Sequence, residues 1–461
     1  MQRITTGHLR VYTYTHIYEF PAPSSTDANP HDELVSELRV VNDAFWIRLC
    51  TMGDLGFSEA YMYGDVECDN LVVLFKIFLL NRKNLSNLDS KASYLFTLPQ
   101  KLTSYRFLNT ISNSQSNISA HYDISNEMFA GFLSEDMTYS CAIFSDLDKD
   151  LKSHPDDLDG WSGGQGLRRL DANAQKTILS STSATEPSND ELYEAQNRKL
   201  RHIISKAKVQ ENHRVLEIGS GWGSCAILLA QTYPGTTVDT LTLSVHQKTL
   251  AEKRIAEAGL QDRIKVHLMD YRCMPPEWEG SFDRFISIEM IEAVGAEYLA
   301  EYWRKVDWAL KTEGGVGVVQ VITIPEPRYD RYIQEIDFIR KWVLFPGGFL
   351  PTVTLLLSDM QKGSSGRLVT DSISNIGPHY ARTLREWRRR FLKQFDSVIV
   401  PALKAEYPTV MNGLKGREEI EVFKRKWLCD CYCEVGFTTR TLGDHIITFT
   451  REGCQEFGCD V

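Results

Sequence analysis

The stretch VLEIGSGWGSCAILLA, residues 215–230, predicts a β-strand that runs into a glycine-rich turn and continues as an α-helix. Glu217 stands near the predicted strand end, and the turn contains Gly219, Gly221 and Gly223. Glycine has no Cβ, so this turn lets the backbone approach a ligand where any side chain would clash. The pattern E-x-G-x-G-x-G is typical of S-adenosylmethionine-binding enzymes. A dinucleotide fingerprint would want a small residue at its sixth position, which Ser224 fills imperfectly.

Strands and helices alternate after this turn. Strand-like runs such as TTVDTLTLS (236–244) and VGVVQVITI (316–324) are separated by helical segments such as HQKTLAEKRIAEAG (246–259). This alternation predicts an α/β fold, a Rossmann-like parallel sheet with helices on both faces, as in class I S-adenosylmethionine-dependent methyltransferases. We expect the segments at 368–376 and 443–453 to add further strands to the same sheet.

The chain divides by composition into five predicted parts. These are a strand pair and helical region (1–120), an active-site segment (121–144), a mobile surface loop (145–190), the cofactor-binding core (191–330), and substrate-covering helices with the final strands (331–461). Within the first part, we expect helices broken near Gly53, Gly56 and Gly64. In the last part, helices should cover the carboxyl ends of the strands, where such sheets bind ligands.

The net charge of −10 argues against nucleic acid as a partner. The longest apolar run, LVVLFKIFLL at 71–80, contains Lys76 and is too short to span a membrane. The N-terminus has no apolar signal core. These features predict a cytoplasmic protein that can contact a membrane peripherally. The sequence leaves open whether the chain forms a homodimer.

The ten cysteines predict no metal site, because they do not show the spacing of metal ligands. The run CDCYC at 429–433 is the one cluster. On a helix its sulfurs would point to opposite faces, and no second Cys or His cluster completes four ligands. Buried structural cysteine is therefore favoured over zinc.

Polar residues at the next two strand ends are candidate cofactor contacts. Thr242 ends the second strand and Gln247 follows it, while Asp270 and Tyr271 follow the third. Each of these taken alone is an ordinary cap or turn residue. Their joint position at successive strand ends favours contact with the ribose and adenine of the cofactor.

Further motifs bring a family resemblance. They occur in the order HYDISNEMF (121–129), MTYSC (137–141), LTLSVHQ (241–247), FISIEMIEAVG (285–295), FPGGFLP (345–351) and NIGPHYARTLREW (375–387). With the glycine turn, they make the chain resemble the cyclopropane-fatty-acyl-phospholipid synthase family, also called mycolic acid cyclopropane synthase-like. The chain is most similar to the fungal and plant-like branch, over about residues 38 to 451.

This resemblance implies an enzyme of lipid biosynthesis. The reaction would transfer a methyl(ene) group from S-adenosylmethionine to the double bond of an unsaturated phospholipid acyl chain, with bicarbonate as the base. The product would be a cyclopropane or a methyl-branched chain. Tyr139 and Ser140 match positions near the cofactor. The positions that match bicarbonate ligands are Cys141, Glu292, Tyr380 and the backbone of Ile324.

Two departures from the family pattern bear on bicarbonate. Ile322 stands where many members have a histidine ligand, and Ala293 follows Glu292 where histidine is common. Gln320 lies two residues before Ile322, hence on the same face of a strand, and is expected to reach the site instead. Bicarbonate is therefore a hypothesis.

Two other functions remain open from the sequence. One is C-methylation of a soluble alkene metabolite, and the other is a non-catalytic, cofactor-binding scaffold, because a fold alone does not prove activity. A basic run could meet lipid phosphates or form a solvated helix face; it comprises Arg385, Arg388, Arg389 and Arg390.

Overall fold

The computed structural model describes residues 3–21, 34–85, 125–153, 190–335, 337–343 and 348–454. The chain forms two compact units, Met1–Phe96 with Asp148–Glu194, and Thr97–Leu147 with Ala195–Val461. The HYD motif at 121–123, most of the loop predicted at 145–190, and positions 345–347 of the FPGG motif lie outside the described residues. The five-part division stays a prediction.

The smaller unit contains a four-stranded sheet in the order β2-β1-β3-β4. Its strands are β1 (His8–Tyr12), β2 (Ile17–Phe20), β3 (Val35–Val40) and β4 (Val66–Cys68). The antiparallel pairing of β1 with β2 confirms the predicted strand pair. β3 and β4 were not predicted, because β4 has only three residues and lies within a helical pattern.

Three α-helices follow β3 or β4 in this unit: α1 (Ala44–Tyr63), α2 (Leu71–Leu80) and α3 (Arg82–Leu85). Helix α1 kinks at Gly53 and ends at Gly64, which adopts the left-handed conformation with a φ of 80°. The predicted breaks at these two glycines are therefore confirmed, whereas the helix continues through Gly56. A short helix, α7 (Lys149–Ser153), also belongs to this unit.

The larger unit is built on a seven-stranded sheet in the order β10-β11-β9-β8-β5-β6-β7. The strands are β5 (Arg214–Ile218), β6 (Thr237–Thr242), β7 (Ile264–Leu268), β8 (Arg284–Ile288), β9 (Val316–Thr323), β10 (Leu368–Asn375) and β11 (Gly443–Arg451). Strands β5 to β9 pair in parallel as predicted. The predicted strands at 368–376 and 443–453 join the same sheet as β10 and β11, but β11 runs antiparallel to both β9 and β10, a direction that the sequence did not predict.

The order of the strands positions a ligand site. The chain starts in the middle of the sheet at β5, goes outward to β6 and β7, and returns to β8 on the other side of β5. In open α/β sheets, ligands bind at the carboxyl ends of the strands where the order reverses in this way. Here that position lies between the loops that follow β5 and β8.

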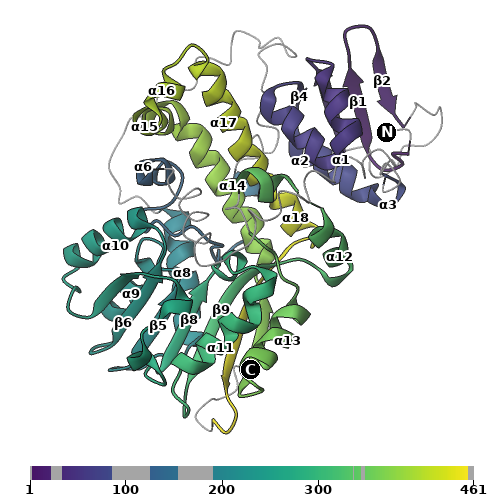
Figure 1. Cartoon of the computed structure of the whole chain (residues 1–461). Coiled ribbons are helices and arrows are strands. Elements are labelled where there is room, and N and C mark those ends of the chain that lie inside the picture. The colour runs from purple at the N-terminus through teal and green to yellow at the C-terminus, as the bar shows by residue number, and fades with distance from the viewer. Residues whose placement is uncertain are drawn as a thin grey trace. The chain divides into compact units, whose positions relative to one another are not determined.

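Helices cover the sheet and the carboxyl ends of its strands (Figure 1). The remaining described α-helices are α6 (Asn126–Ala130), α8 (Glu191–Lys206), α9 (Ser224–Thr232), α10 (Val245–Glu257), α11 (Leu299–Ala309), α12 (Glu326–Gln334), α13 (Val353–Gly363), α14 (Gly377–Gln394), α15 (Val400–Glu406), α16 (Pro408–Met411), α17 (Gly416–Cys431) and α18 (Glu434–Thr438). No helix in the described ranges is long and apolar enough to cross a membrane.

The predicted helical cover over the strand ends is confirmed by contacts. Tyr380 on α14 donates a hydrogen bond to Glu289, which directly follows β8. Asn126 on α6 accepts one from Trp222 in the glycine turn. α17 joins the same cover, since the Trp427 ring packs against Phe129 of α6.

Candidate active site

The glycine turn between β5 and α9 borders a cavity at the switch point of the sheet. Gly219 and Gly221 line this cavity and have φ angles of 104° and 49°, which favour glycine. Gly223, also predicted to bind the cofactor, does not line it. A Cβ at Gly223 would lie 3.3 Å from the Cβ of Ala251, so this glycine allows α9 and α10 to pack closely.

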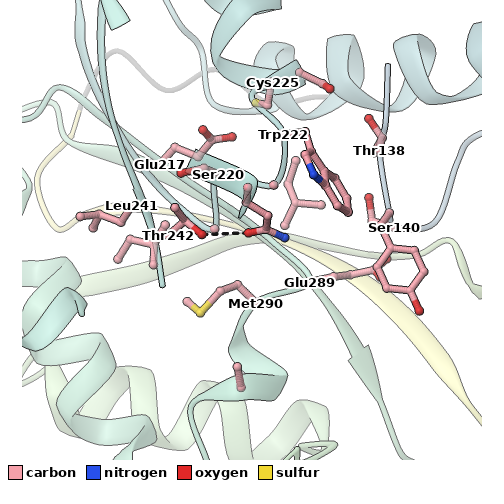
Figure 2. Close-up of a pocket in the computed structure, with 18 of the residues that line it drawn as sticks. Thr138, Ser140, Glu217, Ser220, Trp222, Cys225, Leu241, Thr242, Glu289 and Met290 are labelled. Carbon is pink, nitrogen blue, oxygen red and sulfur yellow. Dashed lines mark hydrogen bonds between the residues drawn. The ribbon is translucent and has the colours of Figure 1, made fainter. Parts of the chain in front are cut away.

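The candidate contacts at the following strand ends also line the cavity. The Thr242 hydroxyl donates to Gln247 Oε1 over 2.8 Å (Figure 2), and Ser244 caps α10 through the backbone N–H of Gln247. The Gln247 amide is thereby fixed at the edge of the cavity. Asp270 lines the cavity beside Tyr271, and its carboxylate pairs with Arg272 at 2.6 Å.

Glu217 is a buried carboxyl group at the end of β5 and also lines the cavity. Burial raises its pKa to about 7, although the Thr240 hydroxyl, which donates to Oε2 over 2.5 Å, favours the ionised form. Its charge therefore depends on the environment that a ligand creates.

The segment from Met137 to Ser140 forms another wall and is held by helix α8. Gln196 Nε2 donates to the backbone oxygen of Ser140 over 2.7 Å, and Lys199 Nζ donates to the Ser140 hydroxyl over 2.5 Å. Desolvation lowers the pKa of the buried Lys199. This anchoring places Tyr139 and Ser140 on the cavity.

Aromatic rings lie beside this wall. Tyr139 stacks on Trp387 with ring centroids 5.0 Å apart, and Trp222 packs against Phe129 at 5.1 Å. Tyr139 and Trp222 themselves line the cavity. Such ring faces stabilise positive charge within about 6 Å of the ring centre.

A partly buried carboxylate, Glu289, lies beside three of the predicted catalytic residues. Its Oε1 accepts hydrogen bonds from the Cys141 backbone N–H at 2.8 Å and from Gln320 Nε2 at 2.7 Å. Its Oε2 accepts one from the Tyr380 hydroxyl at 2.7 Å. Figure 2 shows Glu289 and Ser140 toward one end of the cavity, and Leu241 and Thr242 toward the other. Of the four clustered residues, Glu289 alone lines the cavity.

A second acid, the buried Asp444 at the start of β11, adjoins this cluster. Gln320 Nε2 donates to Asp444 Oδ2 over 2.8 Å as well as to Glu289. Burial, and then the charge of Glu289, raise the pKa of Asp444 well above its usual value. Burial also raises the pKa of Glu289, opposed by the charge of Lys199 and by its hydrogen-bond donors. With three donors on Glu289 and one amide donor on Asp444, we assign the negative charge to Glu289.

The comparisons with known proteins agree with this geometry. The model of the mycolic acid cyclopropane synthetase family matches residues 110–156 and 174–427. The chain is 32% identical to the tuberculostearic acid methyltransferase UfaA1 of Mycobacterium tuberculosis over 89% of this chain and 82% of that protein. The chain belongs to the mycolic acid cyclopropane synthetase family. It is an S-adenosylmethionine-dependent methyltransferase that acts on lipids.

One further relative and one solved structure are also similar to this chain. The cyclopropane-fatty-acyl-phospholipid synthase of Escherichia coli strain K12 is 28% identical over 79% of this chain and 78% of its own. The structure of the cyclopropane synthase MmaA2 from Mycobacterium tuberculosis superposes with a TM-score of 0.53 at 21% identity, covering 73% of this chain and 97% of that one. The second comparison bears on the fold.

Glu292 and Ile324 form no hydrogen bond with Glu289 among the described residues, although the family resemblance placed both among the bicarbonate ligands. Glu292 Oε1 accepts from the Ile322 backbone N–H at 2.6 Å. The backbone N–H of Ile324 donates to the Pro351 oxygen at 3.0 Å. Cys141 joins through its backbone, while burial raises the pKa of its thiol well above the usual value. A thiolate nucleophile is therefore disfavoured.

Glu289 itself was missed in the sequence. Two signals mark it: it is an acidic residue directly after the buried strand FISI, and it adopts a φ of 47°. Left-handed backbone at a residue other than glycine is uncommon and clusters at functional sites. Only the first of these signals was readable from the sequence.

Replacing Glu292 with glutamine should make the free energy of unfolding less sensitive to pH. Burial, followed by the charge of Glu289, raises the pKa of Glu292 from 4.5 to about 8. A raised carboxyl pKa gives stability that is fully present below the unfolded pKa and is lost as the pH rises through the folded pKa. The Glu292→Gln variant should therefore gain stability over wild type between about pH 5 and pH 9, by on the order of 3 kcal/mol. Thermal unfolding across this range measures the gain, and a constant difference in Tm would contradict it.

Proposed function

We propose that this methyltransferase acts on the carbon–carbon double bond of an unsaturated acyl chain of a phospholipid and forms a cyclopropane. The observation that carries the proposal is the cavity, which joins a glycine turn suited to S-adenosylmethionine to a partly buried carboxylate, Glu289. The names of the Escherichia coli and Mycobacterium tuberculosis relatives, which refer to fatty-acyl phospholipid and fatty acid chemistry, support a lipid acyl substrate.

The residues along the cavity fit the cofactor by their chemistry. Gly219 and Gly221 allow its close approach, and the side chains of Thr242, Gln247 and Asp270 offer polar groups for its ribose and adenine. S-adenosylmethionine, when bound, supplies an electrophilic methyl group on a positively charged sulfur. Glu217, Tyr139, Ser140 and Tyr271 complete the proposed set.

The alkene of an acyl chain is a weak nucleophile, so the protein must align it and exclude water. Tyr139 and Trp222 provide apolar surface at the cavity, and Trp387 backs the Tyr139 ring. When one alkene carbon is methylated, the other becomes positively charged, and these ring faces can stabilise that charge. Removal of a proton from the new methyl group then closes the three-membered ring. A saturated methyl-branched product would need a reductant as well, so we favour the cyclopropane.

The bicarbonate hypothesis stays a prediction, but the described residues do not fit a bound bicarbonate. Its expected donors, the Cys141 N–H and the Tyr380 hydroxyl, both donate to Glu289, and the Ile324 N–H donates to Pro351. No step of the proposed reaction is therefore assigned to it.

We also propose that the turn around α16 touches the lipid surface. Three apolar side chains are exposed there, namely Tyr407, Val410 and Leu414. The predicted basic run is a poorer candidate, because Arg388 pairs with Glu434 at 3.2 Å and Arg389 with Glu386 at 2.6 Å.

Replacing Leu414 with aspartate should weaken binding to phospholipid vesicles. Leu414 is fully exposed, so the change should leave the fold intact while removing apolar area that enters the lipid. The expected loss is about tenfold in vesicle affinity, the equivalent of burying most of one leucine side chain. Co-sedimentation with vesicles measures it. Val369→Asp, at an exposed valine on β10, is the matched control, and an equal loss in both variants would contradict the prediction.

The proposed substrate is tested with methyl-labelled S-adenosylmethionine. Vesicles of a monounsaturated phospholipid should gain the label in the acyl chains, measured by mass spectrometry of the released fatty acids. The alternative, C-methylation of a soluble alkene metabolite, predicts label in a panel of small alkenes and none in the vesicles. If the protein binds the cofactor but labels neither the vesicles nor the small alkenes, the hypothesis of a non-catalytic scaffold remains.

A further inference from the structure

We propose that the carboxylate of Glu289 is the base of the methyl-transfer reaction and takes the place of an external bicarbonate ion. This inference rests on the proposed function, because it concerns the proton that leaves when the ring closes. It adds a catalytic residue supplied by the chain itself.

Glu289 accepts hydrogen bonds from residues that were expected to hold bicarbonate. Bicarbonate and a glutamate side chain both present carboxylate oxygens to their donors. The family resemblance assigned the residues Cys141 and Tyr380 to bicarbonate. In the structure, the Cys141 N–H and the Tyr380 hydroxyl donate to Glu289 at 2.8 and 2.7 Å. Gln320 adds a third donor at 2.7 Å. Glu289 thus occupies the acceptor position of the hypothetical ion.

The charges around Glu289 disfavour an additional anion. Asp444 and Glu292 are buried near Glu289, and the charge of Glu289 raises the pKa of both. A bicarbonate ion here would add another negative group to three carboxyl groups, and like charges in a buried site repel. The positive charge of the buried Lys199 lowers the pKa of Glu289, and a single carboxylate balances that charge.

Within this cluster, Glu289 is placed to reach a substrate. Glu289 lines the cavity, whereas Cys141, Gln320 and Tyr380 do not. An ionised carboxylate can accept about four hydrogen bonds, and Glu289 accepts two on Oε1 and one on Oε2 from these residues. Oε2, which takes one of these three donors where Oε1 takes two, is therefore the oxygen that we assign to the incoming proton. Glu289 has a φ of 47°, a left-handed conformation that is uncommon for residues other than glycine and that clusters at functional sites.

The proposed reaction begins with methyl transfer to the alkene and ends with loss of a proton to Glu289. The carbon–sulfur bond of the donor breaks while a carbon–carbon bond forms at one alkene carbon, and the other alkene carbon becomes positive. Glu289 Oε2 removes one proton from the new methyl group, and the electron pair of that C–H bond closes the ring. Glu289 ends as a carboxylic acid and returns its proton to water after the product leaves. Asp444 and Gln320 act as positioning residues, since Gln320 Nε2 bridges the two carboxyl groups.

Two measurements on the wild-type enzyme test the proposal. The first needs no lipid substrate: NMR of isotope-labelled bicarbonate should show no saturable binding to the protein. The second compares turnover of monounsaturated vesicles in CO2-free buffer with and without added bicarbonate, and the rates should agree within about twofold, since a resident base needs no external ion. Saturable binding, or a rate that falls at least about tenfold when bicarbonate is removed, would overturn the proposal.

A rescue experiment adds an independent readout. Glu289→Ala leaves the donors of Cys141, Gln320 and Tyr380 without their acceptor, so formate or bicarbonate should restore turnover by at least about tenfold. Glu301→Ala, on the partly exposed face of α11, is the control and should show no response to either ion. Failure of both ions to rescue a folded, cofactor-binding variant would speak against the proposal. If the wild-type enzyme turns over no lipid, the proposed function fails, while bicarbonate binding still decides on Glu289.

Discussion

Glu289→Gln should lower the rate of lipid methylation by a factor on the order of 10³, while S-adenosylmethionine still binds. Glutamine has nearly the same shape and keeps an oxygen for the Cys141 N–H or the Tyr380 hydroxyl, so the fold should tolerate it. Its amide cannot take up a proton at neutral pH, so the step that closes the ring loses its base. The measurement is the incorporation of labelled methyl groups into monounsaturated vesicles, with cofactor affinity from calorimetry.

The control for this variant is Glu301→Gln, which removes one negative charge from a partly exposed helix position paired with Arg304. It should keep the wild-type rate, because the pair lies at the surface, where ion pairs contribute little. A Glu289→Gln enzyme with a rate near that of wild type would show that another group removes the proton.

Gly221→Ala should weaken S-adenosylmethionine binding about tenfold or more, the equivalent of at least about 1.4 kcal/mol. Gly221 has a φ of 49° and lines the cavity, and an added Cβ would meet no protein atom within 4 Å. The methyl group would therefore occupy space on the ligand side of the turn, where it would displace the cofactor. Isothermal titration calorimetry measures the loss.

Gly259→Ala provides the matched control. Gly259 follows α10, has a φ of 68°, and likewise has no atom within 4 Å of an added Cβ, but it does not line the cavity. Both variants should lose similar stability from the left-handed backbone, on the order of 1 kcal/mol. Equal cofactor affinity in the two variants would contradict a direct contact between Gly221 and the cofactor.

The sheet was predictable because its signals are local. The run VLEI before Gly219 is buried along its length, as expected for a parallel strand covered on both faces. The direction of β11 was not predictable, because its apolar run suits either a parallel or an antiparallel neighbour. Its pairing with β9 depends on the intervening helices, which return the chain to the opposite end of the sheet.

The site residues also differ in how far the sequence could predict them. The cofactor side follows from the turn and the strand ends, which are close in sequence, and Tyr139 and Ser140 followed from motif resemblance. The carboxylate cluster unites Glu289 with partners far apart in sequence, among them Cys141, Tyr380 and Asp444. No local pattern links these positions, so the choice between Glu289 and Glu292 needed the three-dimensional structure.

The measurement that tests the account most directly uses S-adenosylmethionine with a fully deuterated methyl group and vesicles of a monounsaturated phospholipid. If methyl transfer to the double bond is followed by loss of a proton from the new methyl group, each modified acyl chain should gain one carbon that carries two deuterium atoms. Mass spectrometry of the released fatty acids reads this directly. Acyl chains that carry all three deuterium atoms, or none while the cofactor binds, would contradict the account.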